Sequence, residues 1–429
     1  MHIDTLIVRG GLSGLGVANR LSTIGVDFHL IEARNRLGGR ILSVASSADA
    51  ETDDRYNLGP SWFWPGQPRI ERLVEDLDLA WFEQEATGNL VFEENDGSVR
   101  RDLDFAPMAG SRRITGGIQC LIEGLAQRIP DARYKLNNKL LTLEFVDDRV
   151  VADISTDAQR TSISARVVVV TIPPRLVIET VGFSPPLNDN IQQWMTATPT
   201  WMAGNAKFVA IYEEPFWRAD GLSGDAISRR GPLLEIHDAS PSSTREGALF
   251  GFVGTPADQR HGKSSEIIDS AIRQLTALFG PKAARTKNIL FEDWRKRPLP
   301  PFHSINLRHS SIRFGPAPHA DAPWNGRVLF ASTEAAQEFG GFLKGGAGDR
   351  RAGSARCNCQ PALDEEPFAS RRTLLTDGNG TGEIPFFAVT RSSQIMTVTE
   401  AALEPPHRTL TRLPFYRRLR PGKDELIVR

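Results

Sequence analysis

The apolar positions near the N-terminus predict a strand, a loop, a helix and a second strand in quick succession. Residues 5–8 form a short apolar run, and residues 10–14 are rich in glycine. The apolar residues between positions 15 and 21 are spaced as on one face of a helix, and residues 28–31 form a second apolar run. This order is half of a mononucleotide-binding fold, so we expect an α/β protein with a doubly wound, Rossmann-like sheet.

Further along the chain, helical spacing predicts helices at residues 69–79 and 112–129. Residues 139–155 alternate between apolar and polar positions on either side of two aspartates, which is typical of a β-hairpin. The β-branched run in "ARVVVVTIPPRL", at residues 167–172, suits a strand covered on both faces and closed by Pro173 and Pro174. These elements extend the first sheet.

The remaining pattern predicts a second α+β domain on a mixed sheet and a tail. Residues 188–197 have helical spacing and residues 205–212 form an apolar strand. Strand-to-helix spacing returns at residues 326–346, whereas the last residues are rich in Arg, Gly, Ser and Pro and have little periodicity. The nucleotide-binding domain is expected at residues 1–72, 106–180 and 318–346. The second, substrate-binding domain is expected at residues 73–105 and 181–317, and a disordered or poorly packed tail at residues 347–429.

Charge and cysteine content exclude several classes of function. The chain of 429 residues has 51 basic and 52 acidic residues, so no excess charge favours nucleic acid or an anionic membrane. Three cysteines are too few for a disulfide framework, and the pair Cys357 and Cys359 lacks the second pair that a zinc site needs. No apolar run is long enough to span a membrane, and no signal peptide is evident. We expect a cytoplasmic protein without a metal or a membrane anchor.

The glycine-rich loop is the first candidate site. Glycines allow a backbone to turn tightly and approach a pyrophosphate, which amide groups at a helix N-terminus then bind. The cofactor-binding residues expected here are Gly10, Gly11, Leu12, Ser13 and Gly14. The first glycine of the G-x-G-x-x-G pattern is replaced by Arg9, which would either crowd the cofactor or reach a phosphate with its positive charge. If it crowds the cofactor, Arg9→Gly should tighten binding.

Glu32, at the end of the second predicted strand, can accept hydrogen bonds from ribose hydroxyls. The string "IEARNRLGGR" that contains it closely resembles the signature of the flavin-containing amine oxidases. The resemblance implies that non-covalently bound FAD is the cofactor, with the glutamate on the adenosine ribose and the Gly-Gly-Arg around the pyrophosphate. The cofactor residues that it adds are Glu32, Ala33, Arg34, Gly38, Gly39 and Arg40, and Leu140 is added at the start of the predicted hairpin.

Further segments resemble the same family in the same order, over residues 1 to about 346. "YNLGPSWFWP" resembles the segment beside the flavin and adds Gly59, Pro60, Ser61 and Trp62. "FASTEAAQEFGGF" resembles the closing FAD motif and adds Ser332, Thr333 and Glu334, with Ser332 where the family usually has glycine. No cysteine lies between Trp294 and Ser304, so a thioether link to the flavin is not expected.

The resemblance also implies catalytic residues and a reaction. Lys207, in "NAKFVAIYEEPFW", is placed where the family has a lysine that holds a water against flavin N5. Trp294 would pack on the flavin, and Phe342 would form one wall of an aromatic cage, with Phe302 or His303 opposite. The reaction implied is oxidation of a small amine at its C–N bond, with hydride transfer to the flavin and molecular oxygen as acceptor, giving an imine and hydrogen peroxide.

Two alternatives stay open. The same scaffold could act on an amino acid, for which Arg218, Arg229 or Arg230 would supply a carboxylate clamp, or on an isoprenoid or porphyrinogen-type substrate. The substitutions at Arg9 and Ser332, together with the unusual tail, are also compatible with an inactive, cofactor-poor family member. The sequence does not indicate an oligomeric state.

Overall fold

The computed structural model describes residues 2–47, 55–156, 159–200, 202–242, 245–296, 318, 323–336 and 343, together with three strands between residues 387 and 428. The chain divides into two compact units. The first comprises Met1–Ile305 and Ile312–Ala355, and the second comprises Asn306–Ser311 and Arg356–Arg429. Both sheets that carry the candidate site belong to the first unit.

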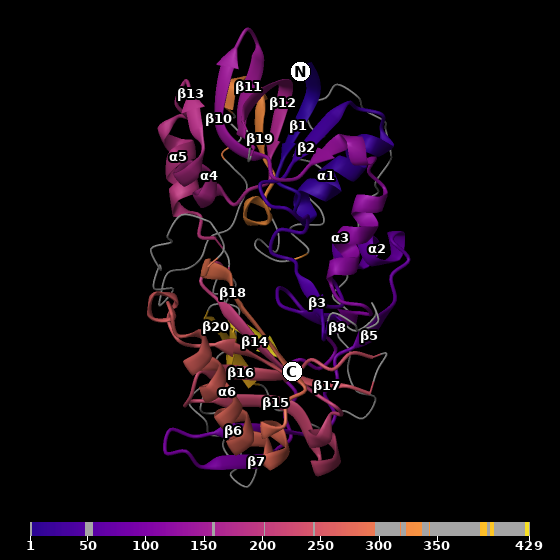
Figure 1. Cartoon of the computed structure of the whole chain (residues 1–429), viewed down its shortest axis with the longest axis vertical. Helices are drawn as coiled ribbons and strands as arrows, with labels where there is room; N and C mark the ends of the chain where they lie inside the picture. The colour runs from indigo at the N-terminus through magenta and orange to yellow at the C-terminus, as the bar shows by residue number, and fades with distance from the viewer. Residues whose placement is uncertain are drawn as a thin grey trace, which may run out of the picture. The chain divides into compact units, whose positions relative to one another are not determined.

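The first sheet has eight strands among the described residues, in the order β13-β10-β11-β12-β1-β2-β9, with β19 also paired to β12. Its strands are β1 (His2–Val8), β2 (Phe28–Ile31), β9 (Tyr134–Lys135), β10 (Lys139–Val146), β11 (Arg149–Ser155), β12 (Arg160–Val170), β13 (Gly182–Ser184) and β19 (Val328–Phe330). Strands β2, β1, β12 and β19 run parallel, whereas β10 and β11 form the predicted antiparallel hairpin. Figure 1 shows β19, from late in the sequence, among the strands of the first half of the chain.

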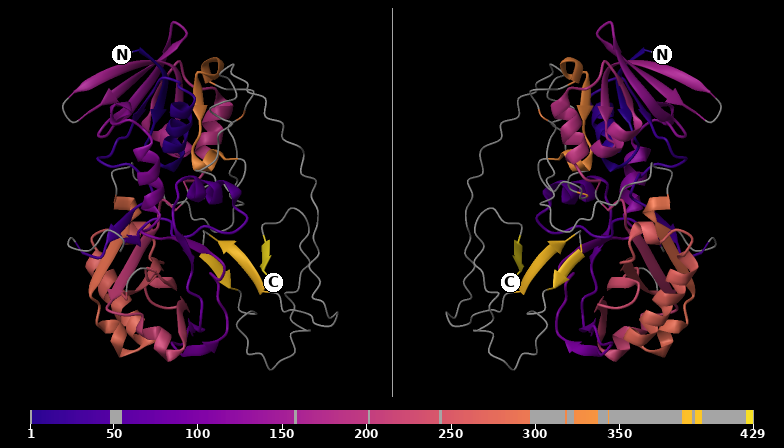
Figure 2. Two further views of the ribbon diagram at one scale, coloured as in Figure 1. Left: turned by 90° about the vertical axis from the view of Figure 1, so that its right-hand side faces the viewer. Right: turned by 90° about the vertical axis from the view of Figure 1, so that its left-hand side faces the viewer.

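Helices cover both faces of this sheet. Helices α1 (Leu12–Thr23), α2 (Pro68–Asp76) and α3 (Gln119–Gln127) pack with Ile7, Phe28 and Leu30 on one side. Helices α4 (Pro174–Thr180) and α5 (Asp189–Ala197) pack with Leu6, Val168 and Val170 on the other, and Figure 2 shows them beside β19. The expected doubly wound α/β architecture is therefore confirmed.

The second sheet is mixed and has the order β18-β14-β17-β16-β15-β6-β7. Its strands are β6 (Asn89–Glu93), β7 (Val99–Leu103), β14 (Ala206–Tyr212), β15 (Leu222–Ser228), β16 (Leu233–Asp238), β17 (Gly247–Val253) and β18 (Asn288–Asp293). The apolar face that carries Phe208 and Leu249 packs against α6 (Ser264–Phe279). The opposite face packs against Tyr56 and Leu58. The prediction of a mixed second sheet is confirmed.

Short elements connect the two sheets. The strand pairs are β3 (Ser43–Ala45) with β4 (Arg55–Asn57), and β5 (Trp81–Glu83) with β8 (Arg112–Ile114). The remaining short helices are η1 (Asp131–Arg133), η2 (Phe216–Asp220), η3 (Ala257–Gln259), η4 (Pro281–Ala284), η5 (Trp294–Lys296), α7 (Pro323–Gly326) and η7 (Thr333–Ala335). The helix predicted at residues 112–129 was wrong in its first part, because Gly116 and Gly117 take φ values of 76° and 88° and end β8 before α3 begins. Among the described residues, none of the helices combines the length and apolar character needed to cross a bilayer.

The domain boundary predicted at residue 180 falls inside the first sheet. Strand β13 pairs with β10, and α5 buries Ile191 and Met195 in the core of that sheet, so the first sheet extends beyond residue 180. In the second unit, β20 (Phe387–Ser392), β21 (Ile395–Val398) and β22 (Glu425–Val428) form an antiparallel sheet. The rest of the tail predicted at residues 347–429 lies outside the described residues.

Candidate active site

The glycine-rich loop joins β1 to α1. Together with Glu32, the loop at residues 34–40 and Glu334, it forms a site that we call the cradle. Arg9 takes the φ of 89° that a glycine would adopt there, and its backbone N–H donates to Ile31 O at 2.7 Å. A Cβ on Gly14 would lie 2.0 Å from Arg9 O, so only glycine allows this close packing of loop and helix. Gly11 is the N-cap of α1, which has neither a side-chain cap bond nor an acidic residue in its first turn. The amides at this end of the helix are arranged to bind an anion.

Glu32 closes one end of the cradle. Its carboxylate accepts hydrogen bonds from the backbone N–H groups of Gly10 and Arg34, each at 2.9 Å. Its backbone N–H donates to Lys135 O, and its carbonyl accepts from Asn138 at 2.8 Å. The side chain is therefore fixed at the edge of the sheet, where its remaining lone pairs can accept from a ribose. The neighbouring Ala33 is exposed.

Arg40 and Glu334 close the other end. Arg40 Nη1 lies 2.7 Å from Glu334 Oε1, and Arg40 Nη2 donates to Thr333 Oγ1 at 2.8 Å. Burial disfavours the charge of Glu334, but the charge and hydrogen bond of Arg40, with the hydrogen bond from Thr333, keep the pKa of Glu334 below its ordinary value. Ser332 precedes this pair, and its buried Oγ has no hydrogen-bond partner among the described residues. An unsatisfied hydroxyl at this position is suited to a ligand.

The loop after β2 wraps around Gly38 and Gly39, both of which have positive φ. Gly38 N–H donates to Gly10 O at 2.8 Å and joins this loop to the first one. Arg34 Nη1 and Arg36 Nη2 both donate to Gly39 O, at 2.9 and 2.8 Å. The two glycine-containing loops thus lie against each other and are surrounded by arginines.

The cradle fits FAD, as the sequence implied. Its glycines leave room beside the backbone, the helix end and the arginines supply donors for a diphosphate, and Glu32 supplies the ribose acceptor. Leu140 is the second residue of β10, two residues after Asn138, and its side chain is buried in the core of the sheet. That Leu140 binds the cofactor stays a prediction, and only its backbone could do so, because its side chain lies in the core.

Lys207 connects the second sheet to the segment after β4. Its Nζ donates to Ser61 Oγ at 2.7 Å and to Gly59 O at 3.2 Å, and lies 3.9 Å from the centre of the Phe250 ring. The side chain is only 3% exposed. Burial, and then the positive charge of Arg113, hold the pKa of Lys207 well below its ordinary value. The lysine is therefore partnered, as a buried lysine must be.

Trp294 and Trp62 both lie near the partners of Lys207. Trp294 follows β18, and its Nε1 donates to Leu58 O at 2.9 Å, next to Gly59. A Cβ on Gly59 would lie 2.2 Å from Arg40 O, so this segment also contacts the cradle. Pro60 follows Gly59, and Trp62 Nε1 donates to Gln84 Oε1 at 2.8 Å. The structure thus brings Lys207, Trp294 and residues 59–62 together beside Arg40. Phe342, Phe302 and His303 lie outside the described residues.

The same face of the second sheet carries a cluster of ionisable groups that the sequence analysis missed. In β16, His237 Nδ1 lies 2.8 Å from Asp225 Oδ1 of β15, and Nε2 lies 3.4 Å from Glu235 Oε1. Burial opposes the charge of His237, but hydrogen bonds to the two carboxylates and their negative charges raise its pKa to about 9. Lys207 pairs with Phe252 across the sheet, and Phe252 pairs with Glu235, so the lysine and this cluster share one face. Glu235 and His237 occupy alternate positions in β16, which was the only sequence signal for this cluster. Such alternation is more typical of a strand with one face in solvent.

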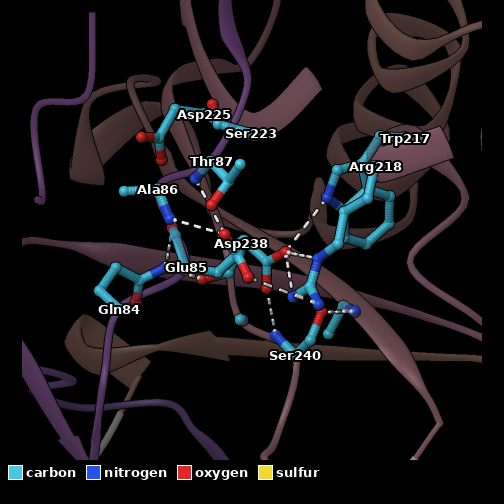
Figure 3. Close-up of polar contacts among 12 residues, drawn as sticks. Gln84, Glu85, Ala86, Thr87, Trp217, Arg218, Ser223, Asp225, Asp238 and Ser240 are labelled. Carbon is cyan, nitrogen blue, oxygen red and sulfur yellow. Dashed lines mark hydrogen bonds and ion pairs between the residues drawn. The ribbon is translucent and has the colours of Figure 1, made fainter. Parts of the chain in front are cut away.

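Gln84 links Trp62 to a polar network around Asp238. The Gln84 amide oxygen accepts from the Trp62 indole N–H at 2.8 Å. The Gln84 amide nitrogen donates to Asp238 O at 2.9 Å (Figure 3). The Asp238 carboxylate accepts from Trp217 Nε1 and from Arg218, and Arg218 also lies 3.8 Å from Glu85. Since Gln84 is only 4% exposed and its amide is satisfied on both sides, it fixes the orientation of the Trp62 ring.

Comparisons with known proteins agree with this geometry. A family model described as flavin containing amine oxidoreductase matches residues 81–348, and one described as an NAD(P)-binding Rossmann-like domain matches residues 7–77. The chain is 31% identical over 444 residues to a probable flavin-containing monoamine oxidase A of Dictyostelium discoideum, covering 80% of this chain and 94% of that protein.

Solved structures show the same fold. Putrescine oxidase bound to putrescine is 19% identical with a TM-score of 0.67, covering 83% of this chain and 98% of that one. Cyclohexylamine oxidase from Brevibacterium oxydans is 18% identical with a TM-score of 0.67, covering 82% and 97%. The predicted resemblance, the flavin cofactor and the amine-oxidase class are confirmed, and the chain belongs to the flavin-containing amine oxidoreductase family.

Proposed function

We propose that this protein oxidises the C–N bond of a small amine on the face of the second sheet that carries Lys207, with molecular oxygen as the electron acceptor. The observation that supports this most strongly is the placement of Lys207, which is buried and hydrogen-bonded to Ser61 and Gly59. Gly59 contacts Arg40 of the cradle, so a group bound in the cradle and an amine near Lys207 would be neighbours. We propose a cytoplasmic location, which the scarcity of cysteines supports.

FAD supplies the redox chemistry when bound, because its flavin accepts a hydride equivalent from the amine α-carbon and returns electrons to oxygen. The protein's own residues bind the cofactor and orient the substrate. Glu32 and the arginines of the cradle hold the adenosine diphosphate half, and Trp62 and Phe250 present aromatic faces beside Lys207. Burial lowers the pKa of Lys207 well below its ordinary value, and its Nζ can donate a hydrogen bond to a water beside the substrate. The products are an imine, which hydrolyses to a carbonyl compound, and hydrogen peroxide.

The three arginines considered for an amino-acid carboxylate have other neighbours. Arg218 is paired with Asp238 and Glu85, and Arg229 lies over the ring of Phe92. The guanidinium of Arg230 lies against Gly97, beside Asp96. These contacts favour an amine over an amino acid as the substrate.

The test is a panel of mono- and diamines with matching amino acids, measured in two ways on the purified full chain. Anaerobic addition of a substrate amine should bleach the flavin absorbance, and aerobic turnover should release one peroxide per amine consumed. Bleaching by amino acids alone, or by none of the compounds in protein that retains FAD, would contradict the proposal.

A further inference from the structure

The guanidinium of Arg9 lies between the two glycine loops. Its Nη2 and Nε lie 3.3 and 3.4 Å from the position that a Cβ on Gly39 would take. Its Nε lies 3.9 Å from the corresponding position on Gly11. The side chain therefore lies in the room that these two glycines leave open, directly beside the N-terminus of α1.

This guanidinium has no acceptor within the part of the chain that the structure describes. It makes neither a hydrogen bond nor an ion pair with a described residue, although its side chain is half-buried. Burial and the neighbouring charges of Arg40 and Arg34 lower the pKa of Arg9 to about 10, against the opposing effects of Glu32 and Glu334. The arginine still carries its charge at neutral pH, where a group without an acceptor is costly.

The surroundings of Arg9 favour a bound anion. The neighbouring arginines have acceptors, since Arg34 and Arg36 donate to Gly39 O and Arg40 is paired with Glu334. The N-terminus of α1 adds its positive dipole end beside the guanidinium of Arg9. This arrangement suits an anion such as the diphosphate of a dinucleotide.

We propose that Arg9 is a direct ligand of the cofactor diphosphate, and that the cradle consequently binds a diphosphate such as ADP without the flavin half. This inference rests on the cofactor site of the proposed function but not on amine oxidation. The long Arg side chain can move off the two glycines and place its fork of donors on the phosphate oxygens. In a loop of glycines, only backbone amides bind the phosphates. Here the charged side chain of Arg9 adds a second kind of donor.

The experiment is calorimetric titration of the full chain, freed of FAD by dialysis, with ADP, AMP and inorganic pyrophosphate. We expect ADP to bind at least about tenfold more tightly than AMP, since AMP lacks the second phosphate. Arg9→Met, which keeps the length of the side chain, and Arg9→Gly should each weaken ADP binding roughly tenfold or more and leave AMP binding less affected. Arg20→Met, at the other end of α1, removes an equal charge as the matched control and should change neither affinity.

Arg9→Gly is expected to fold, because glycine favours the positive φ of this position. Tighter ADP binding by Arg9→Gly would show that the guanidinium obstructs the cradle and would overturn the proposal, as would unchanged binding. Absence of ADP binding to the unsubstituted protein would overturn it too. A second readout on the FAD-loaded protein is the salt concentration that releases FAD, followed by flavin fluorescence, which should fall in both Arg9 variants. Either result is independent of whether any amine is oxidised.

Discussion

Arg40 and Glu334 are separated by 294 residues in sequence, yet their side chains form a two-pronged ion pair at the end of the cradle. Glu334 is completely buried, and the Arg40 side chain is 27% exposed. The pair ties the loop after β2 to the segment after β19, so it joins the first and last parts of the first sheet.

Glu334→Gln should lower the free energy of unfolding by about 3 kcal/mol at pH 7, because the partly buried Arg40 then loses its charged partner. The pKa of Glu334 lies below its ordinary value in the folded protein. The stability that this carboxylate provides is therefore complete above the unfolded pKa of about 4.3 and is lost as the pH falls through the lower folded pKa. Urea unfolding at several pH values should show the variant and the parent converging below about pH 4. The control is Glu123→Gln, which breaks the more exposed pair with Arg55 and should cost less than about 1 kcal/mol.

Two glycines of α1 should respond oppositely to alanine. In Gly14→Ala, the new Cβ would lie 2.0 Å from Arg9 O, so we expect a loss of about 2 kcal/mol or more and loss of bound FAD. In Gly16→Ala, the Cβ would meet no atom within 4 Å, so the helix should gain up to about 1 kcal/mol. Thermal unfolding and the ratio of flavin to protein absorbance measure both effects. Equal behaviour of the two variants would mean that the close contact between Gly14 and Arg9 does not exist.

Lys207→Met should slow flavin reduction by the amine or its reoxidation by oxygen while FAD stays bound. Methionine fills a similar apolar space but cannot donate to Ser61 or Gly59. Stopped-flow absorbance, first without oxygen and then with it, separates the two half-reactions. Lys287→Met, which removes a half-exposed lysine paired with Glu246, is the control and should leave both rates unchanged. If both rates of Lys207→Met match the parent, Lys207 has no part in the reaction.

The buried His237 should make stability depend on pH in the alkaline range. Its pKa in the folded protein is about 9, above the unfolded value of about 6.5, because Asp225 and Glu235 outweigh the cost of burial. The resulting stability is complete below about pH 6.5 and is lost as the pH rises through about 9. The melting temperature of the parent should therefore fall over this range relative to that of His237→Gln. His261→Gln, at an exposed position, should retain the parent's profile.

The fold was largely predictable because its parts have strong local patterns. β1, α1 and β2 follow directly from apolar spacing around a glycine loop, and the hairpin of β10 and β11 turns at Asp147 and Asp148, which take positive φ as predicted turn residues do. The single helix expected from residue 112 failed because two glycines with positive φ interrupt it, a conformation that spacing alone does not reveal.

The site was predictable only where a motif specified it. Glu32, Arg40 and Lys207 lie in recognisable strings, and the structure gives each of them defined partners. The cluster of His237, Glu235 and Asp225 depends on the pairing of β15 with β16 and on which face of the sheet is buried. Neither property is local in sequence, so residue spacing could not have identified this cluster.

The pairing of β12 with β19 means that the first sheet can be completed only after most of the chain has been synthesised. Val328 to Phe330 lie beside Val168 to Val170, and the whole second sheet is encoded between them apart from β6 and β7. While the nascent chain leaves the ribosome, residues 168–170 of β12 therefore lack their partner in β19, and Arg40 lacks Glu334. The cradle is completed late in translation, because a chain that ends before residue 328 lacks Thr333 and Glu334, which hold Arg40.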